Sequence, residues 1–319
     1  MQITMHDILI ANTRIQDHLV KTPLIHSNCL SQFTHANVWF KMENLQKTGS
    51  FKPRGALNKI FSLHTHEKQN GVITASAGNH AQGVALAANL VGTSALIVVP
   101  EKAPETKKEG IRQLGAELVI HGSNYDEAED YANQLAETTG RTYIHAYEDP
   151  YIIAGQGTVG LEALLDHPDM DIILVPSGGG GLICGIAIAA KTINPKIKVI
   201  GVQSHASPPW YYSFKEKRMV DVEYKDSLAD GLHGTIGEEN LKLALKYVDD
   251  FVLVEEKEVA EAMCWMAIQH HFMIEGSAAV GIAALLHNRV DVSGKKVLNI
   301  ITGGNVDAKR LATLLSENK

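Results

Sequence analysis

Four consecutive glycines, Gly178–Gly181, are the strongest chemical signal in the sequence. They follow an apolar run at 171–176 and precede a helical pattern that continues to about Ile193. Because glycine has no Cβ, the backbone N–H groups of such a turn can close around an anion, and the positive end of the following helix favours the same charge. The expected ligand is a phosphate. The segment is not a P-loop, because no Gly-Lys-Ser/Thr follows, and Ile183 and Cys184 stand where a G-x-G-x-x-G motif would need glycine.

A lysine directly before a proline, Lys52-Pro53, is the second signal. Pro53 suits the first turn of a helix. The dipole at that end opposes a cation, which favours the neutral, nucleophilic amine, and such amines form Schiff bases with carbonyl compounds. A lysine in a polar loop is usually only solvated, so this signal needs support from the other segments.

Two further polar segments stand where strands are expected to end. Ser76–His80 follows the apolar run 72–75, and Thr302–Asn305 follows the run 297–301. In an open parallel sheet, ligands bind beyond the carboxyl ends of the strands. The glycines occupy the same kind of position, so three segments are predicted to converge on one site.

The elements that would position these segments alternate regularly. Continuous apolar runs, separated by segments of helix length, are typical of parallel strands joined by right-handed crossover helices. They predict an α/β fold with two open, mostly parallel twisted sheets flanked by helices. Residues 204–237, rich in proline, glycine and aromatics, are predicted to form irregular surface structure. Strands are expected at 72–75, 95–100, 117–120, 142–144, 171–176, 198–202, 251–254 and 297–301.

Composition restricts the class of protein. The 319 residues are 45% hydrophobic with a net charge of −7, which excludes global disorder and disfavours a duplex nucleic-acid binder. Three widely spaced cysteines predict neither a disulfide framework nor a zinc site, and no metal site is expected among the histidines. With no signal-peptide pattern and no long apolar run, we expect a cytoplasmic protein that binds neither membrane nor nucleic acid.

Together, the segments 50–56, 76–83, 178–181 and 302–305 resemble, in order and spacing, the fold-type-II pyridoxal-phosphate enzymes. Within these enzymes, the chain resembles the serine/threonine dehydratase branch, which also contains serine racemase. The resemblance extends over nearly the whole chain. It implies a fold like that of the tryptophan synthase β-subunit, pyridoxal 5'-phosphate as cofactor, an amino-acid substrate and a homodimer. It also implies a large cofactor-binding domain (1–50 and 148–319) and a small mobile domain (51–147).

The resemblance also implies roles for individual residues. Lys52 would hold the cofactor covalently and act as the base, with Ser76 and Thr302 as further catalytic residues. Phe51 and Glu275 would lie beside the cofactor ring. Asn79 would bind the phenolic oxygen, Thr302 the pyridine nitrogen, and the phosphate would be bound by Gly178, Gly179, Gly180, Gly181 and Leu182. The substrate carboxylate would be received by Ser76, Ala77, Gly78, Asn79 and His80.

The implied reaction is a β-elimination. A hydroxyl such as that of Thr302 can donate to a pyridine nitrogen but does not hold a proton there as a carboxylate would, and this suits elimination better than transamination. L-Threonine and L-serine would be dehydrated and deaminated to 2-oxobutanoate and pyruvate plus ammonia, so the chain is expected to be an ammonia-lyase.

Other activities stay open. Serine racemases carry a serine directly before the Gly-Asn of the substrate loop, where this chain has Ala77, although Ser76 stands next to it. Their acidic divalent-cation site has no counterpart in 203–209, which contains no carboxylate. The segment 208–212 is unusually aromatic, so another substrate, such as 3-hydroxyaspartate, stays an open alternative. A β-replacement enzyme like cysteine synthase usually has Ser-Gly-Asn-Thr at 77–80, and an inactive ligand-binding homologue would have lost Lys52 or the glycines.

Overall fold

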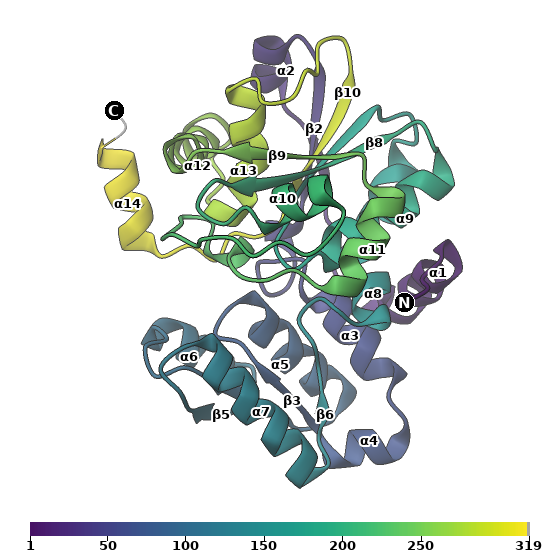
Figure 1. Cartoon of the computed structure of the whole chain (residues 1–319), viewed down its shortest axis with the longest axis vertical. Coiled ribbons are helices and arrows are strands. Elements are labelled where there is room, and N and C mark those ends of the chain that lie inside the picture. Colours follow the sequence, from purple (N-terminus) through teal and green to yellow (C-terminus); the bar gives the residue numbers. More distant parts are fainter. Residues whose placement is uncertain (318–319) are drawn as a thin grey trace.

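The computed structural model describes residues 1–317 and contains two sheets, each covered by helices (Figure 1). The larger sheet has the order β1-β2-β10-β7-β8-β9 and the smaller one β5-β4-β3-β6. The strands of the larger sheet are β1 (Leu24–His26), β2 (Asn37–Met42), β10 (Lys296–Ile301), β7 (Ile172–Pro176), β8 (Lys198–Ser204) and β9 (Asp250–Val254). Those of the smaller sheet are β5 (Glu117–Ile120), β4 (Ala95–Val99), β3 (Val72–Ala75) and β6 (Thr142–Tyr143).

The predicted α/β class with mostly parallel sheets is confirmed, although strands β1 and β2 were not among the expected ones. All pairs in both sheets are parallel except β1 with β2, which is antiparallel, so the larger sheet is mixed. Every residue of β3 and of β7 is buried. Strands covered on both faces need continuous apolar runs, which explains why their positions were readable from the sequence.

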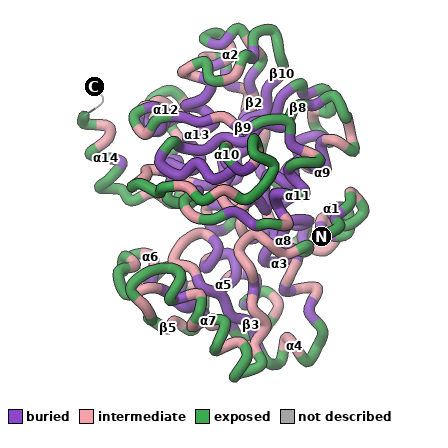
Figure 2. Tube along the Cα trace, viewed as in Figure 1, coloured by how far each residue is buried: buried purple, intermediate pink, exposed green. Residues whose placement is uncertain are grey.

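The helices connect and cover the strands. Those around the smaller sheet are α3 (Pro53–Ser62), α4 (Thr65–Asn70), α5 (Asn79–Val91), α6 (Glu105–Gln113) and α7 (Tyr125–Thr139). The others are α1 (Met5–Ile15), α2 (Asn28–Thr34), α8 (Pro150–Asp166), α9 (Gly181–Ile193), α10 (Pro209–Glu216), α11 (Glu238–Tyr247), α12 (Glu256–His270), α13 (Gly276–Leu286) and α14 (Ala308–Glu317). Figure 2 shows that buried residues are concentrated in the strands and in helices such as α8 and α13.

One prediction was wrong. Residues 209–216 form helix α10, and Trp210 is fully buried, whereas irregular surface structure was expected there. Proline at the first helical positions is a start signal for a helix rather than a break. The aromatic ring is buried because it stacks on Phe251 of β9, with ring centroids 5.0 Å apart.

Among residues 1–317, no helix combines the length and hydropathy needed to cross a bilayer. The same residues contain no group of three or more His, Cys, Asp or Glu side chains that could hold a metal ion.

Candidate active site

A cavity of about 760 Å³ lies between the carboxyl ends of β3, β7 and β10. It is the place where ligands bind in open parallel sheets. The structure brings to its walls all the site residues predicted from the sequence: Phe51, Lys52, Ser76, Ala77, Gly78, Asn79, His80, Gly178, Gly179, Gly180, Gly181, Leu182, Glu275 and Thr302.

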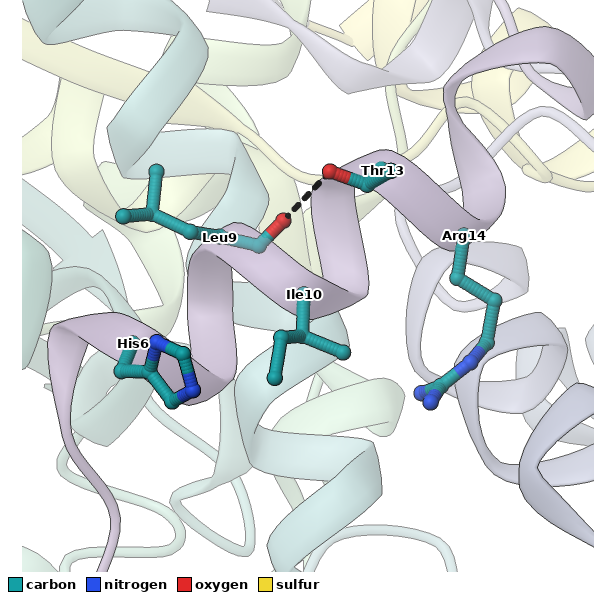
Figure 3. A pocket seen from close by; sticks show the side chains of 5 residues that line it. All are labelled: His6, Leu9, Ile10, Thr13 and Arg14. Carbon is teal, nitrogen blue, oxygen red and sulfur yellow. Dashed lines mark hydrogen bonds between the residues drawn. The ribbon is translucent and has the colours of Figure 1, made fainter.

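A smaller hollow on the outer face of α1 has no comparable chemistry (Figure 3). It is lined by His6, Leu9, Ile10, Thr13 and Arg14, all from the same helix. The hydrogen bond drawn there joins Thr13 Oγ1 to the carbonyl of Leu9 one turn earlier, at 3.1 Å. This hollow is therefore lined by a single helix, whereas the large cavity is lined by residues from several strands and helices.

Lys52 directly precedes α3 and occupies its N-cap, with Pro53 in the first turn, as predicted. Its Nζ donates to the carbonyl of Ala146 at 3.0 Å and lies 5.3 Å from the centroid of the Phe51 ring. Burial of the amine lowers the pKa of Lys52 to about 8, and the charge of Glu275 opposes this shift. An amine with such a pKa has a sizeable neutral fraction near neutral pH, which nucleophilic or basic chemistry requires.

A buried ion cluster holds the beginning of α3 in place. Arg54 is 1% exposed, and its guanidinium bonds the carboxylates of Glu43 and Glu162, with distances between 2.7 and 2.9 Å. Lys41 Nζ also bonds Glu162, at 2.7 Å. Since Arg54 is two residues from Lys52, the cluster helps to fix the backbone from which the Lys52 side chain extends. Sequence reasoning missed this cluster, because its members come from three distant segments.

The glycines lie between β7 and α9, in the predicted turn, and Gly180 has a φ of +104°, which disfavours any side chain there. The helix begins without a side-chain cap, so its first N–H groups are available to an anion. A Cβ on Gly179 would lie 2.2 Å from ring atoms of Tyr147. Glycine is thus needed here for packing as well as for the turn.

Thr302 follows β10 and is 3% exposed. Its Oγ1 has no hydrogen-bond partner among residues 1–317, although it lines the cavity. A buried hydroxyl without a partner costs free energy unless a ligand supplies one. The residues present fit pyridoxal phosphate. The unpartnered hydroxyl of Thr302 can bond the ring nitrogen, the uncapped glycine turn can bind the phosphate, and the lysine of lowered pKa can react with the aldehyde.

Asn79, Glu275 and Asn305 form a hydrogen-bonded chain in the cavity wall. Asn79 Nδ2 donates to both carboxylate oxygens of Glu275, at 2.9 and 3.1 Å, and Asn305 Nδ2 donates to Asn79 Oδ1 at 2.7 Å. Burial raises the pKa of Glu275 to about 7, while the bond from Asn79 opposes the shift. The expected contact of Asn79 with a phenolic oxygen stays a prediction.

The segment Ser76–His80 leads from β3 into α5. Ser76 Oγ accepts the N–H of Gly78 at 3.1 Å, and α5 begins at Asn79 without a side-chain cap. Its first N–H groups can therefore receive a carboxylate. The His80 ring is hydrogen-bonded to the carbonyl of Ile144 at 2.9 Å, and burial lowers its pKa to about 3, so it is neutral. His80 can thus serve an anion through its backbone but not through ring charge.

Sequence reasoning missed part of the cavity wall. Helix α7 contributes Tyr125 and Glu129, and the hydroxyls of Tyr125 and Tyr143 both donate to Glu129 Oε1, at 3.0 and 2.9 Å. At the cavity mouth, Lys107 Nζ lies 3.2 Å from Asp230 Oδ2. The signal available for α7 was its position directly after the strand predicted at 117–120.

Comparison with known families matches residues 15–303 to the family described as "Pyridoxal-phosphate dependent enzyme". L-Threonine ammonia-lyase of Thermotoga maritima is 46% identical over 316 residues, which cover 99% of this chain and 79% of that protein. Catabolic L-threonine dehydratase of Staphylococcus aureus is 41% identical over 318 residues, which cover 98% of this chain and 92% of that protein.

Solved structures agree with this similarity. Maize serine racemase superposes with a TM-score of 0.94 at 34% identity, covering 99% of this chain and 98% of that chain. The processed form of threonine deaminase isoform 2 from Solanum lycopersicum has a TM-score of 0.93 at 35% identity, covering 98% of this chain and 91% of that chain.

Proposed function

Since the chain belongs to the family of pyridoxal-phosphate dependent enzymes, we propose that it is an ammonia-lyase that dehydrates and deaminates L-threonine and L-serine. The products are 2-oxobutanoate from threonine and pyruvate from serine, each with one ammonia. The relatives described as L-threonine ammonia-lyase and L-threonine dehydratase support this assignment. The observation that carries it is the convergence of Lys52, the glycine turn and the unpartnered hydroxyl of Thr302 on one cavity.

Each group in the cavity has a proposed task. When bound, pyridoxal phosphate supplies an electron-accepting ring conjugated to the substrate nitrogen. Lys52 Nζ, with its pKa lowered to about 8, would hold the cofactor between turnovers. When the substrate has replaced this amine, the free amine removes the Cα proton. The N–H groups at the start of α5 bind the substrate carboxylate and orient Cα toward this amine.

Thr302 sets the type of reaction. Its neutral Oγ1 would donate to the ring nitrogen without protonating it. This favours expulsion of the β-hydroxyl over a long-lived charge at Cα, and the proton that Lys52 takes from Cα balances the one needed for the hydroxyl to leave as water. The unsaturated amine that leaves the site takes up water and releases ammonia. Threonine thereby loses one ammonia overall, with the water lost in the elimination regained in hydrolysis.

A panel of β-hydroxy amino acids tests the proposal. Purified enzyme is incubated with the L- and D-forms of threonine, serine and 3-hydroxyaspartate, and 2-oxo acid and ammonia are measured together with the chirality of the remaining substrate. L-Threonine and L-serine should release 2-oxo acid faster than the other compounds. Inversion of serine that outpaces 2-oxo acid release would overturn the assignment.

Serine racemisation is the second candidate, favoured by the overall similarity to maize serine racemase. It needs an acid or base on the face of Cα opposite Lys52. The cavity has Ala77 in the segment that would face this side, and alanine has no proton to exchange. This favours the lyase.

We further propose that residues 51–147 form a small mobile domain that closes over the substrate, against a large domain of residues 1–50 and 148–319. The ion pair between Lys107 and Asp230 joins the two at the cavity mouth, and closure would exclude water from the site.

A homodimer and a cytoplasmic location are also proposed. Cys29 and Cys184 form no disulfide, which agrees with the reducing compartment proposed for the protein. The homodimer is tested by light scattering, which measures the mass of the assembly in solution.

A further inference from the structure

Three consecutive carbonyls of the glycine turn are held from outside the cavity by side-chain N–H groups. The donors come from three separate elements, β8, α10 and α11, and each is a fully buried side chain. The pairs are Gln203 Nε2 with the carbonyl of Ser177 at 3.0 Å, Trp210 Nε1 with that of Gly178, and Asn240 Nδ2 with that of Gly179 at 2.8 Å.

These bonds set the direction of the peptide groups. In a trans peptide, the C=O and the following N–H point in opposite directions. Holding the carbonyls of residues 177–179 outward therefore turns the N–H groups of residues 178–180 toward the cavity. Within residues 1–317, the hydrogen bonds made by Gly178, Gly179 and Gly180 all use their carbonyls, which leaves these N–H groups to a ligand.

The three side chains support one another. Gln203 Oε1 accepts the backbone N–H of Trp210 at 2.9 Å, so one amide group anchors both α10 and the turn. The Trp210 ring stacks on Phe251 and fills the space beside Gly180, where a Cβ would lie 2.4 Å from Trp210 Cζ2. Asn240 Nδ2 also donates to the carbonyl of Tyr147 at 3.2 Å.

We propose that Gln203, Trp210 and Asn240 are positioning residues that hold the turn in the conformation that binds the cofactor phosphate. The inference rests on the proposed place of that phosphate in the turn. It also assigns a role to the aromatic segment 208–212, which has no part in the proposed reaction. The donors are uncharged, so they orient the turn without competing for the phosphate charge.

The test compares cofactor forms with and without the phosphate. Full-length holoenzyme is dialysed against decreasing concentrations of pyridoxal 5'-phosphate or of pyridoxal, and the bound fraction is measured by visible absorbance. Trp210→Phe keeps an aromatic ring on Phe251 but removes the N–H that holds Gly178. The loss of one such hydrogen bond should raise the dissociation constant for pyridoxal phosphate about three- to tenfold and leave that for pyridoxal unchanged.

Trp39→Phe is the matched control. Its indole N–H bonds Asn37 Oδ1 at 2.9 Å on β2, and the residue does not line the cavity, so both dissociation constants should stay at the wild-type values. Asn240→Leu removes a different donor at similar volume and should repeat the selective loss. Phosphorus NMR of each holoenzyme gives a second readout, in which the phosphate signal should shift in Trp210→Phe and not in Trp39→Phe.

Two results would overturn the inference. Equal weakening of pyridoxal phosphate and pyridoxal would mean that the side chains only support packing, and no weakening in either variant would mean that they do not orient the turn. Failure of the underlying proposal looks different. Wild-type enzyme would then bind pyridoxal as tightly as pyridoxal phosphate, or would not deaminate L-threonine.

Discussion

Replacing Glu275 by glutamine should remove a specific pH dependence of stability. Burial raises the pKa of this carboxyl to about 7 from its ordinary value of 4.5. Below pH 4.5 the folded and unfolded chains both hold the proton, so its stabilising contribution is complete there. As the pH rises toward 7, the unfolded chain releases the proton first, and stability falls. The difference between the two pKa values corresponds to about 3 kcal/mol, lost once the pH exceeds about 7.

Thermal unfolding of wild type and Glu275→Gln from pH 4.5 to 8 measures this contribution. Glutamine can still accept the hydrogen bond from Asn79 but does not titrate. The melting temperature of the variant minus that of the wild type should therefore increase by about 4–5 °C across the window, because the unfolding entropy of a chain of this length is about 0.7 kcal/mol/K. The lowered pKa of Lys52 acts separately, because its window lies between about 8 and 10.5. A melting-temperature difference that stays constant with pH would refute the assignment of a buried, weakly acidic carboxyl.

Two further substitutions test other parts of the site. Ala77→Ser should add a proton donor on the face of Cα opposite Lys52 and so produce D-serine from L-serine, measured by chiral chromatography. Ala77→Gly, which adds no proton donor, is the control. Complete absence of D-serine in the Ala77→Ser variant would argue against the placement of residue 77 on that face. Arg54→Met should lower the free energy of unfolding by about 3–5 kcal/mol in denaturant titrations, because Glu43 and Glu162 then lose their buried partner. Exposed Arg112→Met, whose ion pair with Glu105 lies at the surface, should leave the free energy of unfolding almost unchanged, and equal losses in both variants would refute the role of the cluster.

The sequence allowed most strands of the two sheets, though not β1 and β2, and the centre of the site to be predicted for a physical reason. Buried parallel strands need uninterrupted apolar runs, and the polar segments after β3, β7 and β10 share one edge by topology. The glycines could be interpreted because their effect on the backbone is local.

The parts that were missed depend on contacts between distant segments. Trp210 is buried because it meets Phe251 and the glycine turn, and no local pattern reports this. Its two preceding prolines were interpreted as a loop signal, although they also suit the start of a helix. The partners of Arg54 are likewise 11 and 108 residues away along the chain.

The central claim is that Lys52 carries the cofactor, and chemical trapping tests it most directly. Purified holoenzyme is reduced with borohydride, digested and analysed by mass spectrometry, alongside a Lys52→Ala variant. Phosphopyridoxyl mass should appear on the peptide containing Lys52 in the wild type and on no peptide of the variant. The modification on another cavity lysine, such as Lys102 or Lys107, or an unmodified Lys52 in protein saturated with cofactor, would contradict the account.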